Sequence, residues 1–468
     1  MFTVRERLRE HRAEVGAPVV DWELAVIAAT LLGFSIVSRP LAGTSLTSAM
    51  VFVGVGLLVG TQALDLFDAP STGEFVKVLA EATLAFVLFS DASRIDLRAL
   101  RREYTVPARL LGFGLPLTIA LGAVLAALIF EQISFTEAVI VAVLLAPTDA
   151  ALGQAVVTEP RLPSRIRQGL NVESGLNDGL CVPLLFIALA VAEADAGSIA
   201  DAHAVRLVTE QIGWGICGGV IGGVLTAAAV TAGARRGLIE ASWLQVVPAA
   251  GAGLAYGFAA PLGGSGFIAA FVAGMVFSAL RRPDRGEVTY LTDQLGEVLN
   301  AVTLLAFGAV LLSPALGDLD WRIGIYAIAS LTVVRMLPVA IAMLGTGARR
   351  PTIAFMGWFG PRGLASIVFA LIVIHDAHLP HVGTIVSVTY VTVGLSVLVH
   401  GVTAAPLTRR YVSWFESHPA SRRPEMESVP APAHRWRRPA GIVGPSPPPS
   451  FDEPDRTTPD RVTLESSA

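Results

Sequence analysis

One short segment between long apolar stretches carries four polar residues: Glu173, Ser174, Asn177 and Asp178. The flanking stretches can only belong in a membrane, where ionisable side chains are costly, so this group indicates a functional site. On a helix, Ser174 shares a face with Asp178, and Glu173 shares the neighbouring face with Asn177. We expect the first face to bind an ion and the second to make a structural ion pair or hydrogen bond. The alternative is that the whole segment only holds helices together.

A second polar group follows Pro147 in the preceding apolar stretch, where Thr148 and Asp149 are adjacent. Proline cannot donate a backbone hydrogen bond and clashes with the preceding turn, so a helix here should break just before Thr148. Carbonyl groups freed by the break and the Thr148 hydroxyl can bind a cation, and Asp149 supplies the negative charge. Alternatively, Asp149 only caps the helix fragment after the break.

Three further charged residues fall within apolar stretches: Glu81, Arg335 and Arg362. Each buried arginine needs a carboxylate partner, and Glu173 is the expected partner of Arg335. We expect structural roles for both arginines, since a cation site gains nothing from a permanent positive charge beside it. Glu81 is either an additional ion ligand or an acid at the membrane interface, and the sequence favours neither.

The two aspartates suggest ion exchange rather than enzymatic chemistry. Asp149 and Asp178 cannot both ionise freely in one dehydrated site, because desolvation and mutual repulsion oppose it. A bound monovalent cation offsets this repulsion, and so does a bound proton. A site at Asp149, Asp178, Ser174 and Thr148 that holds either ion exchanges them when the protein alternates which side is open.

The elements that must position these residues are membrane-spanning helices. Apolar residues make up 53% of the 468 residues and charged residues 15%, and the mean hydropathy is +0.62, as in polytopic membrane proteins. The expected fold class is therefore all-α, with about 13 apolar runs long enough to be transmembrane helices. These runs begin near Val19, Ser45, Glu74, Val106, Phe135, Gln168, Leu207, Trp243, Gly263, Leu295, Ile323, Ile353 and Val382.

Arginines gather in the loops after odd-numbered spans. The even-numbered loops carry acids and histidines instead, such as Glu193, Asp318 and His378. By the positive-inside rule the odd loops are cytoplasmic, so in a plasma membrane the amino terminus is outside and the carboxyl terminus inside. We expect an extracytoplasmic segment over 1–18, a transmembrane domain over 19–410, and a disordered cytoplasmic tail over 411–468, where Pro, Ser and charge predominate.

Charge and cysteine usage exclude other classes of partner. The net charge of −4 is too small to indicate nucleic acid. The two cysteines, Cys181 and Cys217, lie in apolar runs, and we expect buried small side chains rather than metal ligands. No cofactor is expected, and the partners are the lipid bilayer and the exchanged ions.

Three motifs together resemble the signature segments of the cation:proton antiporter superfamily, in its sodium/proton exchanger (NhaP-like) branch. They are Thr148-Asp149, the run from Glu173 to Gly179, and the Gly-Pro-Arg-Gly run over 360–363. Segments 89–98 and 265–274 resemble further parts of that family, and the resemblance covers about residues 20–410 in the same order. The chain departs from the commonest pattern at Ala150, where many relatives have proline, and at Pro361.

The resemblance implies inverted repeats with crossed broken helices, and usually a homodimer. It also implies ion contact by Asp178, Asp149, Ser174 and Thr148, with Glu173 and Arg335 as a stabilising pair. Asn177 before Asp178 is similar to the electroneutral branch, since the electrogenic branch generally has two adjacent aspartates and an intramembrane lysine. The expected activity is exchange of one monovalent cation for one proton, with sodium ahead of potassium or lithium.

Two other classes remain as alternatives. A cation channel is the nearer one, although the sequence lacks the repeated carbonyl or acid rings of channel filters. An intramembrane serine protease using Ser265 needs a histidine base at matching depth. His375, His378 and His381 fall at or near a predicted outer loop, and His400 lies near the inner end of a span. The glycines around Ser265 are more simply explained by close helix packing.

Overall fold

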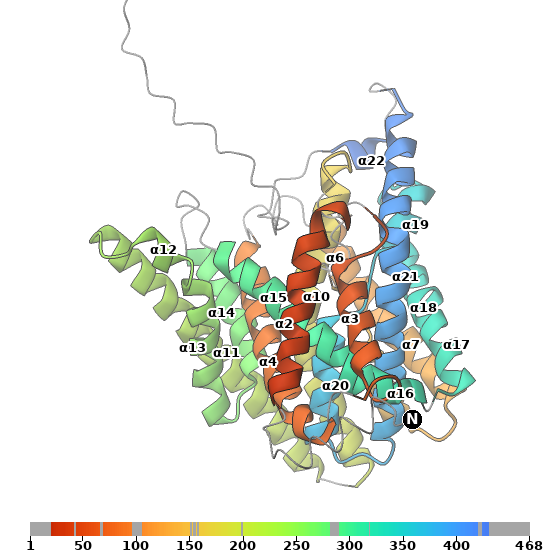
Figure 1. Ribbon diagram of the computed structural model, residues 1–468, viewed down its shortest axis with the longest axis horizontal. Coiled ribbons are helices and arrows are strands. Elements are labelled where there is room, and N and C mark those ends of the chain that lie inside the picture. The colour runs from red at the N-terminus through yellow and green to blue at the C-terminus, as the bar shows by residue number, and fades with distance from the viewer. Residues whose placement is uncertain are drawn as a thin grey trace, which may run out of the picture.

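The computed structural model describes residues 20–41, 44–65, 69–95, 105–149, 152, 156, 159–197, 200–280, 290–317, 319–419 and 424–429. Every regular element in these ranges is helical, as the all-α prediction requires (Figure 1). The helices are α2 (Val20–Leu41), α3 (Ser48–Val59), α4 (Ala69–Arg94), α6 (Thr105–Arg109), η1 (Leu110–Gly114), α7 (Leu115–Ile129), α8 (Phe135–Leu144), α10 (Ser164–Asp195), α11 (Asp201–Arg235), α12 (Ala241–Leu244), α13 (Val247–Ala259), η2 (Ala260–Leu262), α14 (Gly266–Leu280), α15 (Tyr290–Ala306), η3 (Phe307–Leu312), α16 (Ser313–Gly317), α17 (Trp321–Leu331), α18 (Val333–Ala342), α19 (Arg350–Trp358), α20 (Leu364–Asp376), α21 (Val382–Glu416) and α22 (Glu425–Ser428).

Within the described residues, seven helical segments are long and apolar enough to cross a membrane, and five shorter helices are apolar as well. The chain is therefore a multi-pass membrane protein. Each expected start of an apolar run lies within a turn or two of a helix start. The count of about 13 spans stays a prediction.

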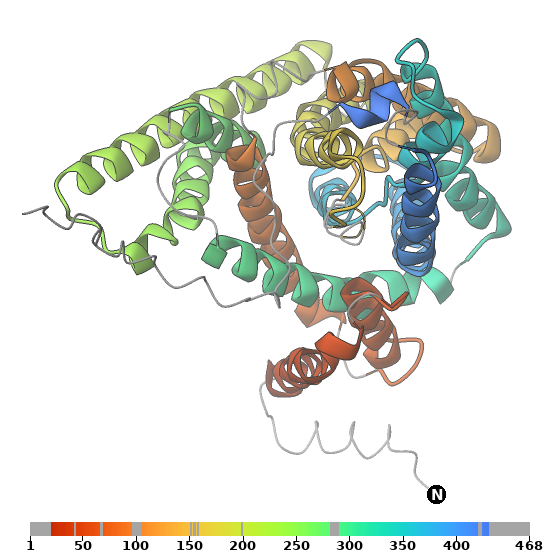
Figure 2. The same cartoon turned by 90° about the horizontal axis from the view of Figure 1, so that it is seen from above.

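The helices form two groups, which lie side by side in the view from above (Figure 2). In one group, α14 packs against α4, α11 and α13. In the other, α7 and α10 pack against α8, and α21 packs against α17 and α20. α10 also contacts the first group: a Cβ added at Gly179 would overlap Phe271 of α14, and one at Gly175 would lie 3.6 Å from Asp91 Cβ of α4. The polar segment of α10 therefore lies where the two groups meet.

Ser265 has the contacts of a helix cap. Its backbone N–H donates to Gln211 O at 2.9 Å, and its hydroxyl accepts from Ile268 N at 3.4 Å. The neighbouring Gly264 and Gly266 are needed for packing, because the side chains of Trp214 and Tyr256 occupy the space of an added Cβ. These contacts explain the serine and its glycines without a protease.

Helical structure continues past residue 410. α21 continues to Glu416, and α22 packs against α10. Glu427, which is 1% exposed, accepts hydrogen bonds from Arg349 N at 2.9 Å and Thr352 Oγ1 at 2.6 Å. A carboxylate is favoured there because the N-terminus of α19 carries partial positive charge. The boundary at 410 stays a prediction, and 1–19, 420–423 and 430–468, with the predictions for them, lie outside the described residues.

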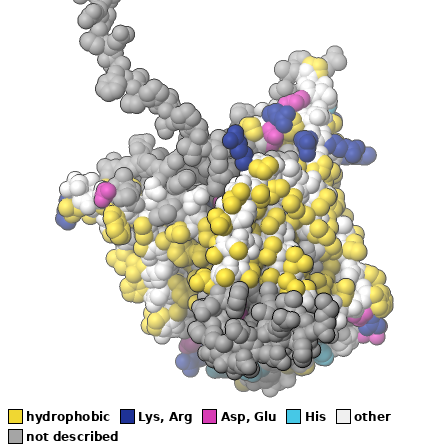
Figure 3. Space-filling view, viewed as in Figure 1, with side chains coloured by type: hydrophobic (Ala, Val, Ile, Leu, Met, Phe, Trp, Pro, Cys, Tyr) yellow, Lys and Arg dark blue, Asp and Glu magenta, His cyan; other side chains and the backbone are white. Residues whose placement is uncertain are grey.

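The surface agrees with a lipid environment. Hydrophobic side chains cover the middle of the face in Figure 3, and arginines gather at the end where α22 lies. Large apolar side chains such as Leu32, Ile36 and Leu128 are exposed, which water would penalise and lipid does not. Cys181 is buried, but Cys217 is exposed on α11, because an apolar face that points to lipid does not need a protein partner.

Candidate functional site

The helix that precedes Thr148 and Asp149 ends near Pro147, as predicted, but three residues earlier than the break expected just before Thr148. α8 begins with a capping box formed by Ser134 and Glu137, and it ends at Leu144. Residues 145–149 are non-helical, because Pro147 has no N–H to continue the helical hydrogen bonds. Ala150 lies outside the described residues.

A second non-helical link, residues 359–363 between α19 and α20, crosses the first one. Asp149 N donates to Pro361 O at 2.7 Å, and the Asp149 carboxylate accepts from Leu364 N at 3.3 Å. Asp149 therefore caps a helix, but the capped helix is α20 rather than a fragment following its own break. The positive end of α20 stabilises negative charge at this position.

The two glycines of the run 360–363 make room for charged side chains. A Cβ at Gly363 would overlap the Asp149 carboxylate, and a Cβ at Gly360 would overlap the Arg335 guanidinium. Between them, Pro361 supplies the carbonyl that Asp149 N contacts, and Arg362 turns toward the first link. The whole Gly-Pro-Arg-Gly run is thus explained by the crossing.

Thr148 is the centre of a small hydroxyl and amide cluster. Its Oγ1 lies 3.0 Å from Ser174 Oγ and accepts from Asn177 Nδ2 at 2.6 Å. The hydrogen bond expected of Asn177 is thus made to Thr148. Residues three apart on a helix are also neighbours, so Ser174 and Asn177 both reach Thr148. Asn177 Oδ1 is buried with no hydrogen-bond partner in the described part of the chain.

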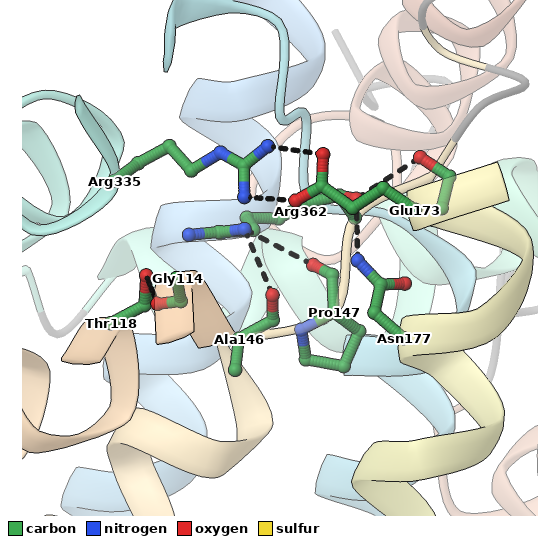
Figure 4. A network of polar contacts seen from close by, with 10 residues as sticks. Gly114, Thr118, Ala146, Pro147, Glu173, Asn177, Arg335 and Arg362 are labelled. Carbon is green, nitrogen blue, oxygen red and sulfur yellow. Dashed lines mark hydrogen bonds and ion pairs between the residues drawn. The ribbon is translucent and has the colours of Figure 1, made fainter. Parts of the chain in front are cut away.

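Glu173 and Arg335 form a bidentate ion pair, which Figure 4 shows beside the place where the two non-helical links cross. Arg335 Nη1 donates to Glu173 Oε1 at 2.5 Å, and Nη2 donates to Oε2 at 2.9 Å. The side chains are only 5% and 3% exposed. α18, which carries Arg335, begins after a kink at Thr332, so this pair ties α18 to α10.

Arg362 contradicts the expectation that each buried arginine takes a carboxylate. It is fully buried, and its Nη1 donates to Ala146 O at 3.1 Å and to Pro147 O at 3.3 Å (Figure 4). These are carbonyl groups freed by the first break, which we had expected to face a transported cation. The guanidinium satisfies them because a proline break leaves backbone acceptors that must find donors inside a membrane.

Asp178 lies one turn beyond Ser174 on α10 and is 8% exposed, while Asp149 is half-buried. Facing this part of α10 is Asp91 of α4, beside Gly175 and in an ion pair with Arg94 at 3.5 Å. We had assigned Asp91 no role, although an aspartate within an apolar run was the signal that could have identified it.

Glu81 is not brought to this cluster. It precedes Asp91 on α4, and at 1.5 Å per residue it lies about 15 Å from it along the helix axis. The structure thus joins Thr148, Ser174 and Asn177 directly. Asp149 follows Thr148 in the chain, and Asp178 lies one turn beyond Ser174 on α10. Glu173 and Arg335 form the ion pair near the crossing, and Arg362 donates to the first link.

Comparisons with known proteins identify a family and several relatives that this chain resembles. Residues 26–410 match the family described as sodium/hydrogen exchanger, transmembrane. The K(+)/H(+) antiporter NhaP2 of Shewanella oneidensis is 26% identical over 393 residues, which are 82% of this chain and 66% of that protein. The Na(+)/H(+) antiporter NhaP of Pseudomonas aeruginosa is 28% identical over 358 residues, which are 72% of this chain and 82% of that protein.

Solved structures show the same fold. The sodium proton antiporter MjNhaP1 from Methanocaldococcus jannaschii, at pH 8, superposes with a TM-score of 0.69 at 18% identity. The match covers 84% of this chain and 98% of that one. The chain spans just under two thirds of the length of the Shewanella relative.

Proposed function

Because the chain belongs to the sodium/hydrogen exchanger family, a family of transporters and not of enzymes, we propose that it exchanges a monovalent cation for a proton across the membrane. The ions compete for one site formed by Asp178, Asp149, Ser174 and Thr148. The observation that carries this proposal is the crossing of 145–149 with 359–363, together with the contacts of Thr148, the neighbour of Asp149, with Ser174 and Asn177 of α10.

The charges at the crossing favour a stoichiometry of one cation for one proton. Glu173 is neutralised by Arg335. The buried charge of Arg362, whose Nη1 donates to the carbonyls of Ala146 and Pro147 in the link that carries Asp149, offsets one of the two aspartates. One net negative charge remains, which either one monovalent cation or one proton balances. Arg362 is therefore more than structural, because it sets the number of ions that the site takes.

The oxygens available suit a small alkali cation. Carboxylate, hydroxyl and amide oxygens are hard ligands, and Asn177 Oδ1 adds a buried oxygen that still needs a partner. We propose sodium as the main cation, with potassium or lithium as alternatives. The single lysine, Lys77, lies 4.0 Å from Asp376 Oδ1 at side-chain exposures of 22% and 60%, so it adds no charge to the site.

The family resemblance and the distribution of arginines also indicate the assembly and the orientation of the chain. We propose a homodimer in the plasma membrane, with the amino terminus outside and the carboxyl terminus in the cytoplasm. Arg161, Arg165, Arg167, Arg349 and Arg350 belong to the loops expected in the cytoplasm, which supports this orientation.

Proteoliposomes test the exchange directly. An imposed outward sodium gradient should acidify the interior, and clamping the membrane voltage at zero with valinomycin and potassium should leave the rate unchanged. A cation channel would instead carry current and would acidify the interior only when a proton path is added. Absence of proton movement with sodium, potassium and lithium would refute the function.

Replacing Gly363 by alanine should abolish exchange, because the new Cβ overlaps the Asp149 carboxylate, which accepts a hydrogen bond from the first residue of α20. The matched control is Gly324→Ala on α17, where nothing lies within 4 Å of the added Cβ. We expect the control to keep the parent rate in the same proteoliposome assay. Parent-like exchange by Gly363→Ala would show that the close approach of Asp149 is unimportant.

A further inference from the structure

The break between α19 and α20 separates two backbone groups that would otherwise bond to each other. In a continuous α-helix, the N–H of Arg362 would donate to the carbonyl of Trp358, four residues earlier. Here α19 ends at Trp358, and the chain is non-helical as far as Gly363. Trp358 O accepts from Gly360 N at 2.9 Å instead. Arg362 is fully buried and Trp358 is partly buried, and unpaired backbone groups are costly inside a membrane.

Two side chains of α21 bridge these separated groups. Arg362 N donates to Ser396 Oγ at 2.7 Å, and Ser396 Oγ lies 3.1 Å from His400 Nδ1. His400 Nε2 lies 3.0 Å from Trp358 O. Ser396 and His400 are 0% and 1% exposed, and they share a face of α21 because they are four residues apart.

Along this bridge, each donor can face an acceptor, in the order Arg362 N, Ser396, His400 and Trp358 O. Ser396 Oγ accepts from the Arg362 amide and can donate its own proton to His400 Nδ1, and a proton on His400 Nε2 then points to Trp358 O. The imidazole also packs against the Trp358 ring, with the two ring centroids 5.4 Å apart. The lost helical hydrogen bond is thus replaced by a serine and a histidine.

We propose that Ser396 and His400 are positioning residues for the ion site. They fix both ends of the link 359–363 to α21, and this link in turn holds the Asp149 backbone and carboxylate. The inference rests on the proposed exchange at Asp149 and Asp178, and it assigns neither Ser396 nor His400 contact with the ion.

Loss of the bridge should weaken cation binding more than turnover. A link with unsatisfied ends adopts the crossed geometry in a smaller fraction of molecules, and apparent affinity falls by that fraction. A cation needs several oxygen ligands held at fixed positions, whereas protonation of an aspartate needs only its own carboxylate. The apparent Michaelis constant for the cation is therefore the quantity that should change.

Four variants in proteoliposomes test this at one alkaline pH, with sodium or whichever alkali cation the parent exchanges fastest. Ser396→Ala removes the acceptor of Arg362 N, and His400→Phe keeps a ring but loses both nitrogens. His400→Gln keeps an N–H that can reach Trp358 O. Thr392→Val is the matched control, since Thr392 is 0% exposed on the same helix but donates only to Val388 O of its own helix.

Ser396→Ala and His400→Phe should raise the apparent Michaelis constant about tenfold, with a maximal rate close to that of the parent. His400→Gln should restore most of the affinity, and Thr392→Val should match the parent. If His400→Phe does not fold, Ser396→Ala carries the same test. Parent-like constants in both, or equal defects in the glutamine and phenylalanine variants, would overturn the inference. Failure of the parent to exchange any cation would refute the proposed function instead.

Discussion

Asp178→Asn is expected to abolish cation-driven proton movement while leaving the protein folded. Asparagine has nearly the same size as aspartate but carries no negative charge and takes up no proton near neutral pH. Asp178 lies one turn beyond Ser174, whose hydroxyl contacts Thr148. The variant therefore loses the charge that either ion would neutralise, and exchange in proteoliposomes should fall to the level of protein-free vesicles.

Asp376→Asn is the matched control for this result. Asp376 ends α20, and its side chain is 60% exposed, so the same chemical change there should leave the exchange rate unchanged. Melting temperatures of both variants should equal that of the parent, which separates loss of function from loss of fold. Robust exchange by a folded Asp178→Asn protein would remove Asp178 from the shared site.

Arg335→Ala is expected to destabilise the protein by about 3–5 kcal/mol, because it leaves the Glu173 charge buried without its partner. Glu173→Gln should have a comparable effect, since Arg335 and Arg362 then lie near each other without a carboxylate between them. The measurement is thermal or denaturant unfolding of the purified protein in detergent. The variant that removes both charges should lose less stability than the sum of the single changes.

An exposed ion pair provides the comparison. Arg206 Nε lies 2.7 Å from Glu210 Oε1, with side chains 73% and 39% exposed, and Arg206→Ala should cost only about 0.5 kcal/mol or less. If Arg335→Ala unfolds at the same temperature as the parent, the pair with Glu173 does not hold α18 to α10.

Local features of this fold were predictable from the sequence, and contacts between distant segments were less so. Pro147 acts through its own missing N–H, so the end of α8 could be placed without knowing what packs around it. The position of the link 359–363 could not be predicted in the same way. Its hydrogen bonds with Asp149 depend on the contact between the two links, which are far apart in the sequence. Arg362 shows the same limit, because charge alone suggested a carboxylate partner and not two carbonyls.

Helical spacing predicted only some of the contacts made by the polar segment of α10. It paired Ser174 with Asp178, and Glu173 with Asn177, as residues four apart. It underestimated the contact between positions three apart, so Asn177 was assigned to a separate structural face although its amide donates to Thr148. Asp91 was missed because it belongs to α4, whose approach to Gly175 is a long-range contact. Similarly, composition identified a polar tail but not the buried Glu427 within it.

Competition between cation and proton at one site is the central claim, and its most direct test is the pH dependence of the apparent Michaelis constant for sodium in proteoliposomes. If protons occupy the same carboxylates, this constant should rise about tenfold for each unit of acidification in the acidic range, with the maximal rate unchanged. A constant that does not vary with pH, accompanied by a falling maximal rate, would show that the proton binds elsewhere and would contradict the shared site.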